Sequence, residues 1–355
     1  MDLYVLNSDF ARIGLVDEYG SIIWNVKYFE IGDFELYLSA TSSNISLLKR
    51  GNCLVRDKDI IGDELHNVMV IEKIELKTDA EEGDHLIVTG RDLRSIIGRR
   101  IVWNQTNLSG KVEMELRRLL TENVISPTDA ARKIEKVTLG ELRGFSETME
   151  QQVTYTNLSE YIVGVLTTYG IGWRCIVTAD KQIRIDFYKG ADRSEAQEEN
   201  PHIIFSPDNE NILNSDYYED YAQYKNVALV AGEGEGTARK RTTVGADSEG
   251  LDRYELCVDA RDTSSNDGEI SEQEYQKLLE LNGLEKLEQS KQVESFSGEI
   301  EPNGMYVYGE DYDLGDIVTV SNLYGMSANP RIIGVIESYS DEGESVIPSF
   351  NSWTE

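Results

Sequence analysis

The stretch "VIEKIELKTDAEEGDHLIV", residues 70–88, predicts a β-hairpin. Aliphatic and β-branched residues dominate both arms, and the polar segment "DAEEGD", residues 79–84, separates them as an acidic turn. The segments before it have the same character and are separated by short polar turns: "LYVLN", "ARIGLVD", "SIIWNVKYF" and "DFELYLSA". Residues 1–104 are therefore predicted to be mostly β, with a short helix at "TSSNISLLKRG".

A similar pattern recurs near the C-terminus. The hairpin at 70–88 follows "LLKRGNCLV", and "IIGVIESYSDEGESVIP", residues 332–348, follows "YDLGDIVTV". The interval from Gly51 to Glu75 is 24 residues, and the interval from Gly315 to Glu337 is 22 residues. An internal duplication is one interpretation, but any antiparallel meander alternates in this way, so both interpretations stay open.

The regions between these stretches differ in character. Residues 105–200 predict a small α+β domain with two helices, the first capped by Ser109 and the second starting after Asn157 and ending at Gly170, followed by a hairpin. Residues 201–355 return to strands, and "EISEQEYQKLLELNGLEKLEQSK" predicts a helix pair, around 271–291, broken at Gly283. The fold class is α+β, mainly β, in three parts: 1–104, 105–200 and 201–355.

Charge and composition exclude several classes of function. The 355 residues carry a net charge of −31, and residues 201–355 hold 32 acidic but only 10 basic residues. Such an excess disfavours nucleic-acid binding, which requires Lys and Arg against phosphates, and suits either solubility or a surface that DNA passes without sticking. No apolar run has the length of a membrane helix and no export signal is present, so we expect a soluble chain. The three cysteines are predicted to be free and buried.

The glycine-rich segment "VAGEGEG" invites comparison with phosphate-binding loops. Gly232, Gly234 and Gly236 alternate with Glu233 and Glu235, whose carboxylates would repel phosphate, and no Walker or dinucleotide motif is present. The segment is better explained as a mobile loop between two strands. No nucleotide or other cofactor is predicted.

Metal and catalytic sites are not indicated either. "TSSNDGEISEQEY" has the spacing of a calcium loop, but Thr263 and Ser265 replace its first two carboxylates, and Ser271 with Glu274 forms a helix capping box instead. Calcium stays the alternative. The three histidines lie in no catalytic motif, so no catalytic residue is predicted.

Six segments, taken in order, resemble the tail-tip or baseplate hub proteins of long-tailed siphophages. This virion-structural family is similar in fold to the central hub of contractile-phage baseplates. The segments are "GDFELYLSA", "LLKRGNCLVRD", "IVTGRDLRSIIGRRIVW", "DYAQYKNVALVAGEGEG", "LDRYELCVDARD" and "DYDLGDIVTV". The resemblance implies two tail-tube-like antiparallel β-barrels per chain, joined by α+β domains, and a ring of three chains.

The implied function is structural and not enzymatic. A homotrimeric hub at the distal end of a phage tail would present six similar barrels to the sixfold tail tube and threefold symmetry below, and would line the DNA channel. Expected partners are distal tail or tail-tube proteins above and tip, fibre or receptor-binding proteins below. DNA would pass without specific binding. The location would be the virion tail, after assembly in the bacterial cytoplasm and without membrane insertion.

The candidate sites are accordingly contact surfaces. Residues Gly232, Glu233, Gly234, Glu235 and Gly236 form a candidate assembly loop. Candidate acids of the lumen or rim lie in two turns: Asp79, Glu81, Glu82, Asp84, Asp341, Glu342 and Glu344. The chain stops at "SFNSWTE", where relatives often continue into a fibre or a wall-cleaving domain, so we expect such activities in a partner. Two other functions stay open, a tail-associated peptidoglycan hydrolase or peptidase and a carbohydrate-binding module.

Overall fold

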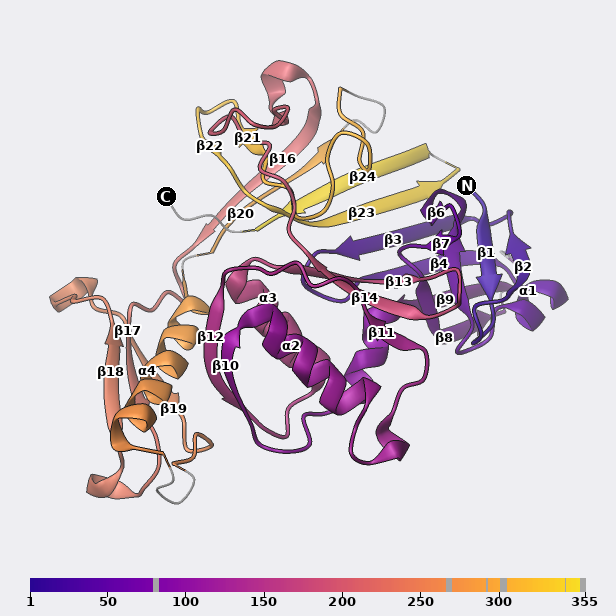
Figure 1. Ribbon diagram of the computed structural model, residues 1–355. Coiled ribbons are helices and arrows are strands. Elements are labelled where there is room, and N and C mark those ends of the chain that lie inside the picture. The colour runs from indigo at the N-terminus through magenta and orange to yellow at the C-terminus, as the bar shows by residue number, and fades with distance from the viewer. Residues whose placement is uncertain (79–82, 266–269, 292, 301–304, 342, 352–355) are drawn as a thin grey trace.

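Strands from the two ends of the chain, β3 (Ser21–Lys27) and β23 (Ile332–Ser340), lie side by side in one large curved sheet (Figure 1). The computed structural model describes residues 1–78, 83–265, 270–291, 293–300, 305–341 and 343–351, and residues 213–216 and 293–299 by their backbone alone. Figure 1 shows helices below this sheet and a small separate body that is attached through β16 and β20.

The large sheet has eleven strands, and every neighbouring pair is antiparallel. In spatial order these are β16 (Ile212–Asp220), β20 (Val293–Ile300), β24 (Gly343–Phe350), β23 (Ile332–Ser340), β3 (Ser21–Lys27), β4 (Asp33–Ser39), β9 (His85–Asp92), β8 (Met69–Lys77), β5 (Cys53–Arg56), β1 (Leu3–Leu6) and β2 (Arg12–Val16). The mainly β prediction is confirmed. The two predicted barrels are parts of one continuous sheet in this chain, not two closed barrels.

Along β3, β4 and β9, one face of the sheet is covered and the other is bare. Side chains alternate between the faces along each strand, so Trp24, Leu36 and Val88 are fully buried while their neighbours Ile23 and Glu35 are exposed. The covered face forms one hydrophobic core with the middle of the chain. The bare face is available to solvent or to other molecules.

Two groups of four strands within the sheet have the same arrangement. The first unit is β3-β4-β9-β8 and the second unit is β16-β20-β24-β23. Since all pairings are antiparallel, corresponding strands of the two units also run in the same direction. The hairpins quoted from the sequence, β8–β9 and β23–β24, occupy the same place in their units.

Main-chain hydrogen bonds before each hairpin establish the repeat. The Gly51 N–H donates to Ile71 and the Ile71 N–H to Asn52, at 2.9 and 2.8 Å; Gly315 and Asp316 make the same pair of bonds with Ile332, both at 2.8 Å. Gly51 and Gly315 both have positive φ, +87° and +91°, where glycine is favoured. The structure therefore favours duplication over chance similarity.

The register corrects the alignment suggested by sequence spacing. A bulge follows Ile71 in β8 and Ile332 in β23, so the residues after these bulges correspond. This makes Leu76, and not Glu75, the equivalent of Glu337. Spacing alone misplaced the match by one residue, which in a strand exchanges the two faces.

The middle of the chain packs against the covered face. A two-stranded sheet, β10 (Thr106–Lys111) and β12 (Thr148–Val153), lies beside α2 (Val112–Leu120), its continuation η3 (Thr121–Ile125), and α3 (Leu158–Tyr169). A five-stranded sheet contains β11 (Val137–Leu139), β14 (Ile183–Tyr188), β13 (Gly172–Val177), β7 (Glu64–Leu65) and β6 (Ile60–Ile61). Asn157 caps α3 and Gly170 ends it, as predicted. The predicted cap Ser109 lies in β10 instead, and Lys111 precedes α2.

Short elements complete this body. A small sheet contains β15 (Ile204–Phe205), β21 (Thr319–Ser321) and β22 (Ser327–Ala328). The short helices are α1 (Ser42–Leu47), η1 (Asp57–Asp59), η2 (Leu93–Arg99), η4 (Ala130–Arg132) and η5 (Pro207–Asn209). The predicted helix near residue 42 is confirmed, and the Thr41 hydroxyl caps it.

An inserted domain separates β16 from β20. It contains β17 (Val227–Ala231), η6 (Gly236–Ala238), β18 (Arg241–Gly245), η7 (Gly250–Asp252), β19 (Glu255–Asp259) and α4 (Glu272–Glu288), and it has its own hydrophobic core. The capping box of Ser271 and Glu274 is confirmed. The predicted helix pair is wrong, because α4 continues through Gly283. A Cβ on Gly283 would lie 2.4 Å from Val230, so glycine here permits close packing on the sheet and does not break the helix.

The cysteines are free, but their burial differs from the prediction. Cys53 and Cys175 are buried, whereas Cys257 is exposed on the face of β19 that α4 does not cover. Among the described helices, none is long and apolar enough to cross a membrane. The described residues also contain no group of three potential ligands that could hold a metal ion.

Candidate assembly surfaces

The two acidic turns lie at the same end of the large sheet. Four antiparallel pairings separate β23 from β8, so these strands run in the same direction. The chain therefore leaves both strands at the same end of the sheet. Of the acids predicted there, Asp84, Asp341 and Glu344 are exposed. The other four, Asp79, Glu81, Glu82 and Glu342, lie outside the described residues. We call this end of the strands the turn end.

The bare face of the sheet is polar, and its charges are paired. Arg91 contacts Glu72 at 2.7 Å and Lys73 contacts Glu75 at 3.0 Å, while serines occupy many of the remaining positions on β23, β24 and β3. A face of this composition offers few unpaired cations to a phosphate backbone. It is less acidic than the composition of the whole chain suggests.

Two strands of the units have a free edge. In the described part of the chain, β16 pairs with β20 alone, and the residues of β8 after Glu72 pair with β9 alone. The side chains of Ile74 and Leu76 on this part of β8 are 39% and 53% exposed. Unpaired strand edges bind further strands readily, so both edges are candidate assembly surfaces. β2, which pairs with β1, is a third edge.

The glycine loop connects β17 to β18, as predicted, but its first half is fixed. A Cβ on Gly232 would lie 2.3 Å from the hydroxyl of Tyr275, a buried residue of α4. That hydroxyl accepts a hydrogen bond from the Glu233 N–H at 2.8 Å. Arg239 donates to the Gly232 carbonyl at 2.9 Å. The prediction of a mobile loop is therefore wrong for Gly232 and Glu233.

The two glutamates of this loop have different roles. The Glu233 carboxylate accepts a hydrogen bond from the Ser265 N–H at 2.6 Å, whereas Glu235 is exposed, as are Gly234 and Gly236. Burial opposes the ionisation of Glu233, but the hydrogen bonds from Ser265 outweigh it and lower the pKa. Glu235 and the neighbouring glycines are the part of the loop that is open to a partner.

Sequence reasoning missed a buried ionic cluster that links β5 and η1 to the second unit. Arg56 of β5 contacts Asp59 of η1 and also Glu337 of β23, and Lys58 contacts the second oxygen of Glu337. Arg56 and Glu337 are each 1% exposed. Burial disfavours the Arg56 charge, but Asp59 and Glu337 outweigh it and raise the pKa above its ordinary value. No sequence signal pairs residues that are 281 positions apart.

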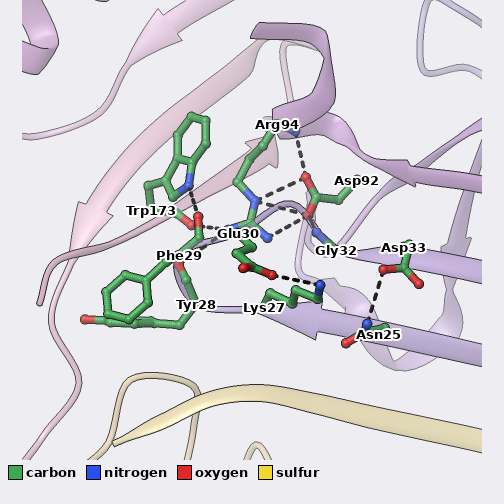
Figure 2. Close-up of polar contacts among 10 residues, drawn as sticks. All are labelled: Asn25, Lys27, Tyr28, Phe29, Glu30, Gly32, Asp33, Asp92, Arg94 and Trp173. Atoms are coloured by element: carbon green, nitrogen blue, oxygen red, sulfur yellow. Dashed lines mark hydrogen bonds and ion pairs between the residues drawn. The ribbon is translucent and has the colours of Figure 1, made fainter. Parts of the chain in front are cut away.

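A second buried ion pair joins the sheet to the middle of the chain (Figure 2). Arg94 binds Asp92 at 2.6 Å and donates to the Trp173 carbonyl at 3.0 Å, while the Trp173 ring N–H donates to Phe29 at 2.7 Å. Asp92 also accepts from the Gly32 N–H at 2.5 Å. Burial disfavours the Arg94 charge, but Asp92 outweighs it and raises the pKa. These contacts hold β13 against the turn between β3 and β4.

The fold is similar to that of known tail proteins. A tail protein from Neisseria meningitidis MC58 aligns with a TM-score of 0.59 and 13% identity over 99% of this chain and 96% of its own. The 43 kDa tail protein of prophage MuSo2 from Shewanella oneidensis aligns with a TM-score of 0.61 and 12% identity over 99% and 98%. Prophage tail protein gp18 from Listeria monocytogenes EGD-e aligns with a TM-score of 0.54 and 13% identity over 100% and 96%.

No curated protein matches the chain in sequence. A family model, however, covers nearly all of it. The predicted resemblance to siphophage proteins is confirmed, because the model of the Siphovirus ReqiPepy6 Gp37-like protein matches residues 2–350, and the chain belongs to this family.

Proposed function

We propose that the protein is a structural component of a phage tail and forms the homotrimeric hub at its distal end. The observation that carries the proposal is the repeated four-stranded unit, present twice in one open sheet, with β16 on one side of the pair of units and the later part of β8 on the other having a free edge. A ring of three such chains would contain six similar units, matching a sixfold tube, and threefold symmetry overall. The fold shared with prophage tail proteins supports the same role.

The bare face of the sheet would line the DNA channel. Its paired charges and serines would keep contact with duplex DNA weak, because counterion release needs unpaired Lys and Arg. The exposed acids of the turn end would add repulsion within a Debye length of about 8 Å. In this proposal residues 1–104 and 201–355 each contribute one tube-like part, and residues 105–200 form the α+β domain between them. Tail-tube proteins would bind one end, and tip or fibre proteins the other.

Solution mass tests the proposal directly. Mass photometry of the purified chain should show a species of three times 40.1 kDa, and low-resolution imaging should show a ring with a central channel. A protein that stays monomeric up to high micromolar concentration would contradict it. A turbidity assay on cell walls tests the alternative, since clearing by this chain alone would favour a hydrolase.

A further inference from the structure

The two units are joined within the chain by one strand pairing. β23, the last strand of the second unit, pairs with β3, the first strand of the first unit, from Gly334 opposite Lys27 to Ser340 opposite Ser21. If similar units repeat around a ring, the same joint must recur between chains. The strand equivalent to β23 is β8, and the strand equivalent to β3 is β16. Within the two units, these are the strands that have a free edge in the part of the chain that the structure describes.

The register of the sheet fixes which residues are equivalent. The bulges place Lys73 with Gly334 and Leu76 with Glu337. Two independent pairings then align β4 with β20. The partners of Glu35 and Leu38 in β9 are equivalent to residues of β24 that lie opposite Ser297 and Ile300, so Glu35 corresponds to Ser297 and Leu38 to Ile300. Both give the same offset of 262 residues.

The same procedure aligns β3 with β16. Trp24 lies opposite Phe34, whose equivalent Phe296 lies opposite Tyr217, so Trp24 corresponds to Tyr217. Three residues further on, Lys27 corresponds to Asp220. The joint between chains is thereby defined to the residue.

From this correspondence we propose that β8 of one chain pairs with β16 of a second copy, with Lys73 opposite Asp220 and Leu76 opposite Tyr217. The inference deepens the proposed function and rests on its homotrimer. It assigns a head-to-tail interface, in which each copy uses one edge for one neighbour and the other edge for the next.

The chemistry of the two edges supports the pairing. Leu76 is 53% exposed, and a tyrosine opposite it would remove apolar surface from water. Lys73 and Asp220 have opposite charges at opposite positions. Seven antiparallel pairings separate β16 from β8, so the new joint is antiparallel like all others in the sheet. Pairing β16 with β2 would instead give a parallel joint, because ten pairings separate them.

Cysteine cross-linking tests the register. In a Cys257→Ser background, where Cys53 and Cys175 stay buried, Leu76→Cys and Tyr217→Cys are made in separate chains. Cα atoms of residues directly opposite each other lie about 4.5–5.5 Å apart, within disulfide range. Mild oxidation of the mixture should give a disulfide-linked dimer, and a chain with both changes should give a covalent trimer. The matched control, Leu76→Cys with Tyr218→Cys, should not cross-link, because a shift of one residue changes the face.

A charge reversal provides an independent readout. Lys73→Glu should raise the concentration for half-assembly about tenfold, because like charges would face each other, and Asp220→Lys should restore it in the same chain. Ile61→Lys, a change at a residue 62% exposed and away from both edges, is the control and should have no effect. Melting temperatures of the variants at low concentration separate assembly from folding.

The outcomes distinguish the interface from the oligomer. Trimers of normal mass with no disulfide between residues 76 and 217 would overturn this interface and leave the proposed function standing. Dimers from Leu76→Cys alone, or a disulfide between Leu15→Cys on β2 and Tyr217→Cys, would replace it with another edge pairing. A protein that stays monomeric under all conditions would contradict both this interface and the proposed trimeric hub.

Discussion

Glu337 and Leu76 occupy the same position in the two units, and their surroundings are opposite. Glu337 lies opposite Trp24 in a completed strand joint, is 1% exposed and binds Arg56 and Lys58. Leu76 lies on a free edge and is 53% exposed. One edge of the repeated unit is therefore closed within the chain, and its equivalent is left open.

The comparison indicates how a repeated unit becomes specific. A buried ion cluster is a weak source of net stability, but removing one member leaves a charge without compensation. The cluster at Glu337 joins β5 to β23, and a shifted register would separate Glu337 from Arg56 and leave buried charges without partners. The apolar side chain of Leu76 makes no ion pair and instead provides apolar surface that a neighbouring strand can bury.

The largest difference is expected between Glu337→Ala and Leu76→Ala. Removing Glu337 leaves Arg56 buried with fewer partners and should lower the free energy of unfolding by about 3–5 kcal/mol. Removing the exposed Leu76 side chain should lower it by about 1 kcal/mol or less. Urea unfolding, at a protein concentration too low for the chains to assemble, measures both changes in the free energy of unfolding. Equal losses would show that the two positions are not distinguished by their surroundings.

The two equivalent glycines should also respond unequally. Gly51→Ala places a Cβ at positive φ in open space and should cost about 1–2 kcal/mol. Gly315→Ala has the same backbone cost, and its Cβ would also lie 2.3 Å from the Tyr28 ring, which adds about 1–3 kcal/mol. Thermal unfolding of both variants gives the comparison. A larger loss for Gly51→Ala would contradict it.

The Glu337 cluster predicts a pH dependence. Burial opposes ionisation of Glu337, but Arg56 and Lys58 outweigh it and lower the pKa below its ordinary value of 4.5. A lowered pKa in the folded state adds stability that is complete above pH 4.5 and is lost as the pH falls through the folded value. Unfolding of the wild type and Glu337→Gln at pH 7, 5, 4 and 3 isolates this contribution. The gap between them should narrow only below about pH 4.5.

The smallest effects are expected in the inserted domain, which belongs to neither unit. Glu233→Gln weakens the hydrogen bond from Ser265 and should cost about 0.5–1.5 kcal/mol. The exposed Glu235→Gln should change stability by less than about 0.5 kcal/mol. Both substitutions should leave the large sheet intact and the mass of the assembled protein in solution unchanged. If Glu235→Gln lowers the free energy of unfolding of the large sheet, measured by urea unfolding, the inserted domain is not independent of the units.

Local patterns were sufficient for much of the fold. The hairpin at 70–88 and its later counterpart, the capped helix between Asn157 and Gly170, and the capping box at Ser271 depend on neighbouring residues and are confirmed. Gly283 was misjudged because its small size serves a contact with Val230, a residue distant in sequence. Cys257 was misjudged because strand patterns do not say which face a helix covers.

The candidate surfaces were only partly predictable. The acidic turns could be named from composition, but their shared edge follows from the strand order. Glu233 looked equivalent to Glu235 in "GEGEG", yet Ser265 and Tyr275 fix Glu233 alone. The free edges of β8 and β16, and the Arg56 cluster, depend on pairings between distant parts of the chain. The alternation of apolar and polar residues shows which face of a strand is buried, but it does not show which strand lies next to it.

The insertion between β16 and β20 has a geometric consequence. Its counterpart in the first unit, the connection between β3 and β4, spans residues 28–32, whereas this one spans residues 221–292. At the turn end both units carry short connections, seven residues in the first unit (78–84) and two in the second (341–342). If three chains close a ring, one rim carries short connections at all six positions, while on the other rim bulky and short connections alternate. The change from six to three is then encoded by the length of a single hairpin connection, with no change in the strands themselves.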